Sequence, residues 1–242
     1  MAQTDQARQD SLVIVSTVLT SISTLIVMGR SILRFFVIMY PSYDDYTILV
    51  AQVFNIGCMV EVLVARANHI GFPASTLTIN NMLSLLKVAL ALEVTYHIIL
   101  GFIKISILCL YLRFAVFRLL RFLCYGTILF QLLVTIASVC VTLWQCLPMR
   151  KQWDVTGTVQ GSCINSTAFF YAIAGINIIT DIWIIVLPIK TLKGINRPLK
   201  EKIALIFIFG AGVFATVMSI VRLQSVYTYT LATDKFRNAI AV

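Results

Sequence analysis

Several ionisable side chains stand inside long apolar stretches, where a charge needs a partner. Lys104 lies nine residues before Arg113, and Asp181 lies nine residues before Lys190. At 1.5 Å per helical residue, both should lie about 13 Å from the same membrane face. An unpaired charge at that depth costs about 2.5–3.5 kcal/mol on insertion scales, so the equal depth predicts an interhelical Lys104–Asp181 pair. Asn177 precedes Asp181 by one helical turn and should share its face.

A second group of polar residues is expected nearer the opposite membrane face. Counted in the same way, Glu93 and Arg222 lie about 30 Å from the first face and also have opposite charges. His97 follows Glu93 by one turn, and Glu61 lies in the preceding apolar stretch. These four residues could line a polar chamber that opens to the outside. Two interpretations stay open: the polar groups only hold helices together, or they form a ligand pocket or a two-state switch.

Other chemistry finds less support in the sequence. No ligand spacing joins Glu61, Glu93, His69 and His97, so we expect no metal site. Lys104 as a Schiff-base lysine for a chromophore is weaker than Lys104 as a paired charge. The sequence has no phosphate-binding glycine loop, nucleophile elbow or zinc-peptidase motif. We therefore expect no cofactor and no catalytic residue.

The elements that must position these residues are membrane helices. The chain has 242 residues, of which 60% are hydrophobic and 12% charged, against about 45–50% and 25% in a soluble domain. Residues 1–242 are expected to form one all-α, polytopic membrane helix bundle. Six apolar stretches are long enough to span a bilayer. They cover residues 11–29, 46–64, 90–112, 122–145, 169–189 and 203–221.

Basic residues gather in the loops after the first, third and fifth stretches. Because short basic loops resist translocation, this side should be cytoplasmic and the N-terminus outside. The net charge of +9 then reflects topology in a lipid bilayer and not nucleic-acid binding. The basic residues on this side are Arg30, Arg34, Arg113, Arg118, Arg121, Lys190, Lys193, Arg197, Lys200 and Lys202. Those of the second and third loops, from Arg113 to Arg121 and from Lys190 to Lys202, form a cytoplasmic basic face for anionic lipid or for a signalling protein.

Two of the six cysteines bracket the loop between the fourth and fifth stretches. Cys146 and Cys163 lie on the expected outer, oxidising side, where a disulfide is plausible. Their spacing permits this bond without proving it. The other four cysteines lie within apolar stretches and are expected to act as small hydrophobic side chains.

A series of short motifs resembles the fungal rhodopsin-domain family over about residues 12–240. This resemblance implies a seven-helix, receptor-like membrane protein with an outside N-terminus, and it does not imply retinal. Some members of the family are described as plant-surface or nutrient sensors, and others are encoded in secondary-metabolite gene clusters. The motifs are Arg30 and Arg34 before Asp44-Asp45-Tyr46-Thr47, Lys104-Ile105-Ser106 with Tyr111-Leu112-Arg113, Cys146-Leu147-Pro148 with Trp153-Asp154 and Gly161-Ser162-Cys163, Asn177-Ile178-Ile179-Thr180-Asp181 with Leu187-Pro188-Ile189, and Ile220-Val221-Arg222-Leu223.

The chain departs from the family pattern in two ways. No cysteine-rich module precedes the first span, and the sequence ends where a seventh helix would start, near Phe236–Val242. We expect a sensing or signalling protein of the plasma membrane that responds to an extracellular small molecule or surface cue. The alternatives from other classes are an accessory scaffold and an intramembrane cyclase of secondary metabolism. In a cyclase, Glu61, Glu93 and Asp181 would be the proton donors.

Overall fold

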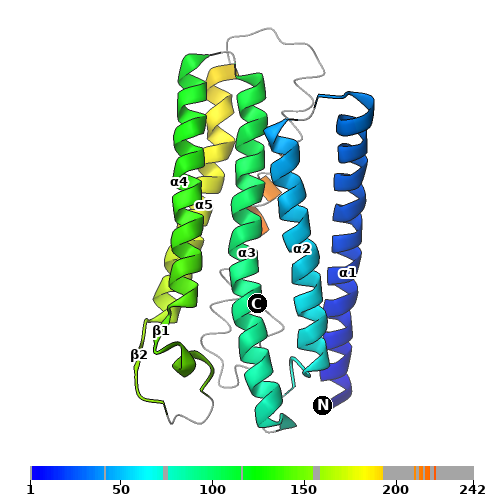
Figure 1. Cartoon of the computed structure of the whole chain (residues 1–242), viewed down its shortest axis with the longest axis vertical. Helices are drawn as coiled ribbons and strands as arrows, with labels where there is room; N and C mark the ends of the chain where they lie inside the picture. The colour runs from blue at the N-terminus through cyan, green and yellow to red at the C-terminus, as the bar shows by residue number, and fades with distance from the viewer. Residues whose placement is uncertain are drawn as a thin grey trace.

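The computed structural model describes residues 2–40, 42–72, 76–115, 117–154 and 159–192, together with 210, 213, 214, 216–218 and 221. These residues form an all-α bundle, as the sequence predicts (Figure 1). Two short strands and two short helical turns complete the described elements. In chain order they are α1 (Ala2–Ile32), the π-helical turn η1 (Leu33–Val37), α2 (Tyr43–Ala67), α3 (Ile79–Phe114), α4 (Arg118–Leu143), β1 (Cys146–Leu147), the 3-10 turn η3 (Met149–Trp153), β2 (Ser162–Cys163) and α5 (Ser166–Leu192).

Five described helices are long and apolar enough to cross a membrane. They coincide with the first five predicted spans, and the sixth, at residues 203–221, falls largely outside the described residues. The predicted start of the third span, residue 90, is 11 residues late, because α3 begins at Ile79. The prediction followed the charge-poor run, whereas the helix continues past Lys87 to an N-terminal cap. There the Thr78 hydroxyl accepts a hydrogen bond from the Asn81 amide at 3.4 Å, which satisfies one unpaired N–H of the first turn.

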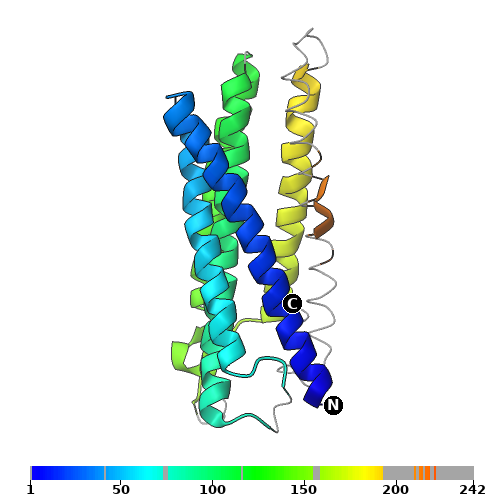
Figure 2. The same ribbon diagram turned by 90° about the vertical axis from the view of Figure 1, so that its right-hand side faces the viewer.

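Successive helices run in opposite directions, so the connections fall at two ends of the bundle (Figures 1 and 2). The start of α1, the α2–α3 connection and the β1–β2 pair lie at one end, which we call the disulfide face. The α1–α2 connection, the α3–α4 turn and the end of α5 lie at the other, which we call the opposite face. This grouping places the N-terminus on the same side as Cys146 and Cys163.

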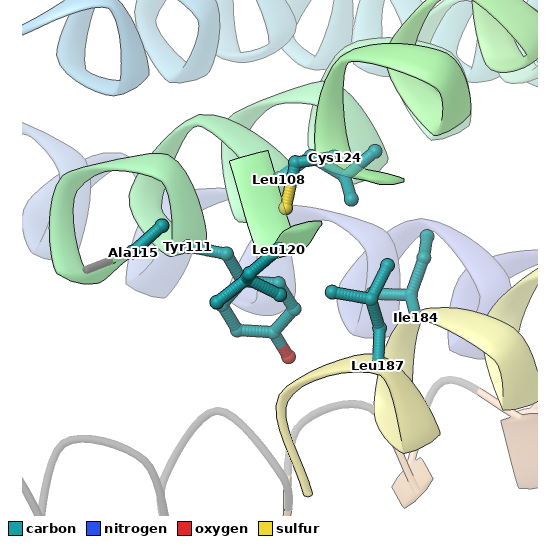
Figure 3. Close-up of a cluster of buried hydrophobic side chains, with 7 residues drawn as sticks. All are labelled: Leu108, Tyr111, Ala115, Leu120, Cys124, Ile184 and Leu187. Atoms are coloured by element: carbon teal, nitrogen blue, oxygen red, sulfur yellow. The ribbon is translucent and has the colours of Figure 1, made fainter. Parts of the chain in front are cut away.

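A hydrophobic core joins α3, α4 and α5 near the opposite face (Figure 3). Leu108 of α3 and Cys124 of α4 are completely buried, and Ile184 and Leu187 of α5 pack in the same cluster. Cys124 thus occupies the position of a small hydrophobic residue. Outward-facing apolar residues such as Leu25 are strongly exposed in the isolated chain, which suits contact with lipid tails.

Polar side chains join α1 to α2 within the membrane-spanning part. Ser23 donates to Gln52 Oε1 at 2.7 Å, and Gln52 Nε2 donates to Thr24 Oγ1 at 2.7 Å. Asn55 Nδ2 donates to Ser23 Oγ at 3.1 Å. Such interhelical hydrogen bonds satisfy amide and hydroxyl groups where lipid offers no partner. They fix how α1 lies against α2 and therefore where α1 presents its arginines.

Candidate functional site

Lys104 of α3 lies among four oxygen atoms of α5. Its Nζ is 3.0 Å from Asp181 Oδ1 and donates to Thr180 Oγ1 at 2.7 Å. It also donates to the side-chain and backbone oxygens of Asn177, at 3.1 and 3.2 Å. Asn177 lies one helical turn before the adjacent residues Thr180 and Asp181, so all three can face α3. We call these four residues the Lys104 cluster.

Burial makes the Lys104 cluster energetically demanding. Lys104 is 4% exposed, and its three partners are also buried. Removing two charges from water costs several kcal/mol per ion, which is offset only when the geometry is good and the remaining protons find acceptors. A lysine ammonium has three protons, and the α5 oxygens supply acceptors for them. The arrangement suits an interhelical charge pair that is stable while α3 and α5 stay in register.

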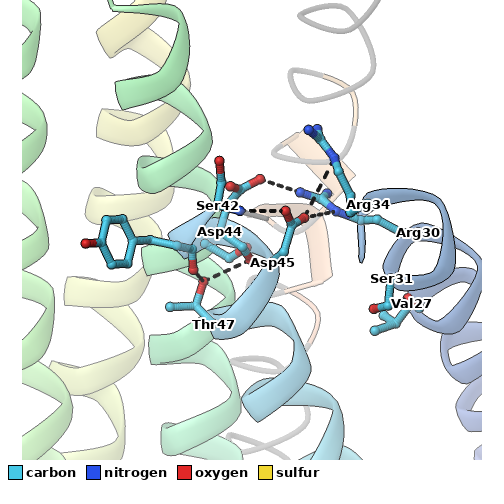
Figure 4. Close-up of polar contacts among 10 residues, drawn as sticks. Val27, Arg30, Ser31, Arg34, Ser42, Asp44, Asp45 and Thr47 are labelled. Carbon is cyan, nitrogen blue, oxygen red and sulfur yellow. Dashed lines mark hydrogen bonds and ion pairs between the residues drawn. The ribbon is translucent and has the colours of Figure 1, made fainter. Parts of the chain in front are cut away.

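A second charged group, which was not among the residues singled out as a site, lies at the opposite face (Figure 4). Arg30 Nη2 lies 2.5 Å from Asp44 Oδ2, and Arg30 Nε lies 3.1 Å from Asp45 Oδ1. Arg34 Nε approaches the same Asp45 oxygen at 3.9 Å. Asp44 and Asp45 are almost fully buried, at 0% and 1% exposure. We call Arg30, Arg34, Asp44 and Asp45 the arginine–aspartate cluster.

Local sequence explains how the arginine–aspartate cluster forms. Arg30 lies in the last turn of α1 and Arg34, four residues later, lies in the π-helical turn η1, and both guanidinium groups approach Asp45. Asp44 and Asp45 occupy the first turn of α2, where the helix dipole favours negative charge. Asp45 Oδ2 also accepts from the Ser42 amide at 3.1 Å, which fixes the start of the helix. The signal that could have revealed the cluster is this pair of arginines followed, after a short connection, by two helix-starting aspartates.

One hydrogen bond connects the backbone of the arginine–aspartate cluster to α3. Ser106 Oγ donates to the Asp44 carbonyl at 3.0 Å, and this contact is buried. Ser106 is two residues from Lys104 on the same helix. The short α3 segment 104–106 therefore contacts α5 through the Lys104 cluster and α2 through the backbone of Asp44.

The acids expected in an outer chamber lie at different helix interfaces. Glu61 of α2 accepts from Thr95 of α3 at 2.9 Å. Glu93 Oε1 accepts from Thr142 of α4 at 3.3 Å and from Gln145 at 3.4 Å. The buried His97 has its Nε2 3.9 Å from the same Glu93 oxygen. Because residues 93 and 95 point to different sides of α3, the described contacts divide Glu61 from Glu93 and His97.

The remaining predicted site residues divide between described and undescribed parts of the chain. Arg113, Arg118 and Arg121 are exposed at the opposite face, and Arg121 Nε also donates to the Ala115 carbonyl at 3.0 Å. Lys190 lies in α5, but its side chain is outside the described set. Arg222 and Lys193 lie outside the described residues, so the expected Glu93–Arg222 pair stays a prediction.

The predicted loop disulfide is present. Cys146 and Cys163 are bonded, and they are also paired across the two-stranded β1–β2 sheet. The Ile164 amide donates to the Gln145 carbonyl at 2.8 Å beside this pair. Elsewhere among the described residues, no three His, Cys, Asp or Glu side chains gather closely enough to hold a metal ion.

Comparison with known protein families assigns a family to the chain. The family model of the fungal rhodopsin domain matches residues 29–242. The chain belongs to the fungal rhodopsin-domain family. The family match includes all four residues of the Lys104 cluster and all four of the arginine–aspartate cluster. No solved structure matches the chain.

The chain is also similar to a curated membrane protein. It is a SAT4 family membrane protein of Emericella nidulans, 33% identical over 143 residues. The match covers 57% of this chain and 36% of the relative, so the chain spans well under two thirds of that protein's length. The relative's name describes it as a membrane protein and states no ligand.

Proposed function

We propose that this protein is a receptor-like sensor, without catalytic activity, in which a cue acting at the disulfide face changes the arrangement at the opposite face. The observation that carries the proposal is the double attachment of α3. Lys104 binds α5, and Ser106, two residues later, binds the start of α2 beside Arg30. A shift of α5 that carries Lys104 and α3 with it would strain the Ser106–Asp44 contact, and so would reach the helix ends that present Arg113, Arg118 and Arg121.

We further propose that the protein lies in the plasma membrane with the N-terminus of α1 outside. Disulfides persist in oxidising compartments, and the Cys146–Cys163 bond lies on the same face as the N-terminus. The exposed arginines of the α3–α4 turn lie at the other face, as the positive-inside rule expects for a cytoplasmic side. A cytoplasmic signalling protein would then contact this basic face.

The intramembrane cyclase is less well supported by the described geometry. Such an enzyme needs its acids around one cavity, next to the substrate. Glu61 lies at the α2–α3 interface, Glu93 at the α3–α4 interface and Asp181 at the α3–α5 interface. Each acid therefore has a neighbour on another helix that accounts for it.

Coupling between the clusters can be tested in lipid nanodiscs by hydrogen–deuterium exchange. Lys104→Met and Asp181→Asn should speed exchange in the α3–α4 turn, residues 113–121, and at the start of α2. Lys87→Met is the matched control, because Lys87 lies on the same helix, exposed and away from the cluster. If folding is lost, Asn177→Ala removes only one acceptor and keeps the test possible. Unchanged exchange at both sites in a folded variant would contradict the proposal.

A further inference from the structure

A groove at the disulfide face lies between the start of α1, the end of α2 and the turn that follows. Its volume is about 550 Å³, within the range of about 300–1,000 Å³ that small-molecule sites occupy. It is open, and it is separate from the Lys104 and arginine–aspartate clusters. Its lining includes Gln9, Asp10, Leu63, Arg66, His69 and Phe72.

The groove holds one cation beside one anion. Arg66 Nη2 lies 2.6 Å from Asp10 Oδ1, and both side chains are about half exposed, at 48% and 44%. A solvent-exposed pair of this kind contributes only about 0–1 kcal/mol, so a ligand can separate it at low cost. The pair therefore offers a guanidinium for a carboxylate and a carboxylate for an ammonium, side by side.

The other residues that line the groove are held in place by the fold, and part of their surface is apolar. Gln9 is buried, and its Nε2 donates to the Arg66 carbonyl at 2.9 Å, which ties α1 to the end of α2. His69 adopts a left-handed backbone conformation with φ of 60°, so the turn is sharply defined. Its ring meets Phe72 edge to face at 5.7 Å between centroids. Together with Leu63, these rings give an apolar surface next to the charges.

We propose that this groove binds a free α-amino acid with an apolar side chain. In such a molecule the ammonium and carboxylate are attached to one carbon, so they can engage the adjacent Asp10 and Arg66 together. The side chain would lie against Leu63 and the His69–Phe72 rings. This proposal names the chemical class of the cue for the proposed sensor. The effect of binding on the opposite face rests on the proposed function, whereas the binding site itself does not.

Calorimetry with leucine on the nanodisc-embedded chain tests the site. Leucine should give saturable heat, whereas N-acetylleucine and leucinamide, each lacking one charge, should bind at least tenfold more weakly. Arg66→Gln and Asp10→Asn should also weaken leucine binding at least tenfold. Arg150→Gln, an exposed arginine of the same face outside the groove, should leave binding unchanged.

Each adverse outcome is informative. The absence of saturable heat up to about 10 mM leucine would overturn the site, as would equal binding by a folded Arg66→Gln variant. Equal binding of N-acetylleucine would show that the groove binds a simple carboxylate and would also overturn the proposal.

Variants are compared only when they elute as a single species with unchanged unfolding temperature. Asp10→Asn provides the test if Arg66→Gln fails this control. Leucine binding without altered exchange at residues 113–121 would uphold the site and contradict the sensor function instead.

Discussion

Gly101 of α3 and Thr135 of α4 lie so close together that a side chain on the glycine would collide with the threonine. A β-carbon built on Gly101 would overlap Thr135 Oγ1 and lie 3.0 Å from its Cγ2. Thr135 Oγ1 donates to the Gln131 carbonyl at 2.9 Å, so its side chain is held in place. Helices in membranes often approach at small residues in this way, because packing replaces the hydrophobic effect there.

The first prediction follows from this contact. Gly101→Ala should destabilise the protein by about 1–3 kcal/mol, because α3 and α4 must move apart. Thermal unfolding in detergent measures the effect. Gly57→Ala is the control, since a β-carbon on Gly57 of α2 meets nothing within 4 Å. Adding Thr135→Ala to Gly101→Ala should recover much of the loss, and equal melting of the two single glycine variants would contradict the prediction.

The buried charge pair gives a second prediction. Lys104→Met leaves the Asp181 carboxylate without its ammonium and should cost about 3–5 kcal/mol. Replacing both residues, Lys104→Met with Asp181→Leu, should cost much less than the sum of the single changes, because no unpaired charge remains. A double-mutant cycle on unfolding in detergent measures the difference. Strictly additive effects would mean that the 3.0 Å contact carries no coupling.

The arginine–aspartate cluster gives a third prediction. Arg30→Gln leaves two adjacent carboxylates, both almost fully buried, without their main cation, and should destabilise the protein by about 3–5 kcal/mol. Arg30→Lys should restore only part of this loss, because an ammonium lacks the forked geometry that reaches both carboxylates. Arg118→Gln, an exposed arginine near the same face, should change stability by less than about 0.5 kcal/mol. A similar melting temperature for Arg30→Gln and Arg118→Gln would refute the prediction.

The fourth prediction concerns the cysteines. The denatured, unreduced chain should react with iodoacetamide at four thiols, because Cys58, Cys109, Cys124 and Cys140 are free. After reduction all six cysteines should react. Intact mass spectrometry counts the adducts. The Cys146→Ser, Cys163→Ser double variant should take up four adducts with and without reductant, and six adducts on unreduced wild-type protein would exclude the disulfide.

The sequence predicts the fold well because one physical quantity dominates it. Apolar length identifies five helices that the structure contains, and equal depth in the bilayer pairs Lys104 with Asp181. Depth along a helix does not predict which side of the helix a residue faces. Glu61 and Glu93 are expected in one chamber, yet the contact of Glu61 with Thr95 places it on a different side of α3.

The arginine–aspartate cluster illustrates a different limit. Asp44 and Asp45 follow a short connection between two apolar stretches of the sequence, where charged residues are usually exposed and need no explanation. Their burial arises only when α1 folds back along α2 and Ser106 of α3 covers the backbone of Asp44. This information is tertiary, so the sequence supplies the two motifs but not their contact.

The length of α3 has a consequence for insertions and deletions. Its 36 residues span about 54 Å. Along that length three neighbouring helices, α2, α4 and α5, are contacted by Glu93, Thr95, Lys104 and Ser106. One extra residue between positions 97 and 101 would turn the two halves of this rod by about 100° relative to each other. The partners at one end would then be lost even though the composition barely changes. An insertion of seven residues would restore the rotation but shift one half by about 10 Å along the axis, so the partners would be lost in that case as well. Length changes in this part of α3 should therefore not be tolerated, which a deletion and insertion library would reveal directly.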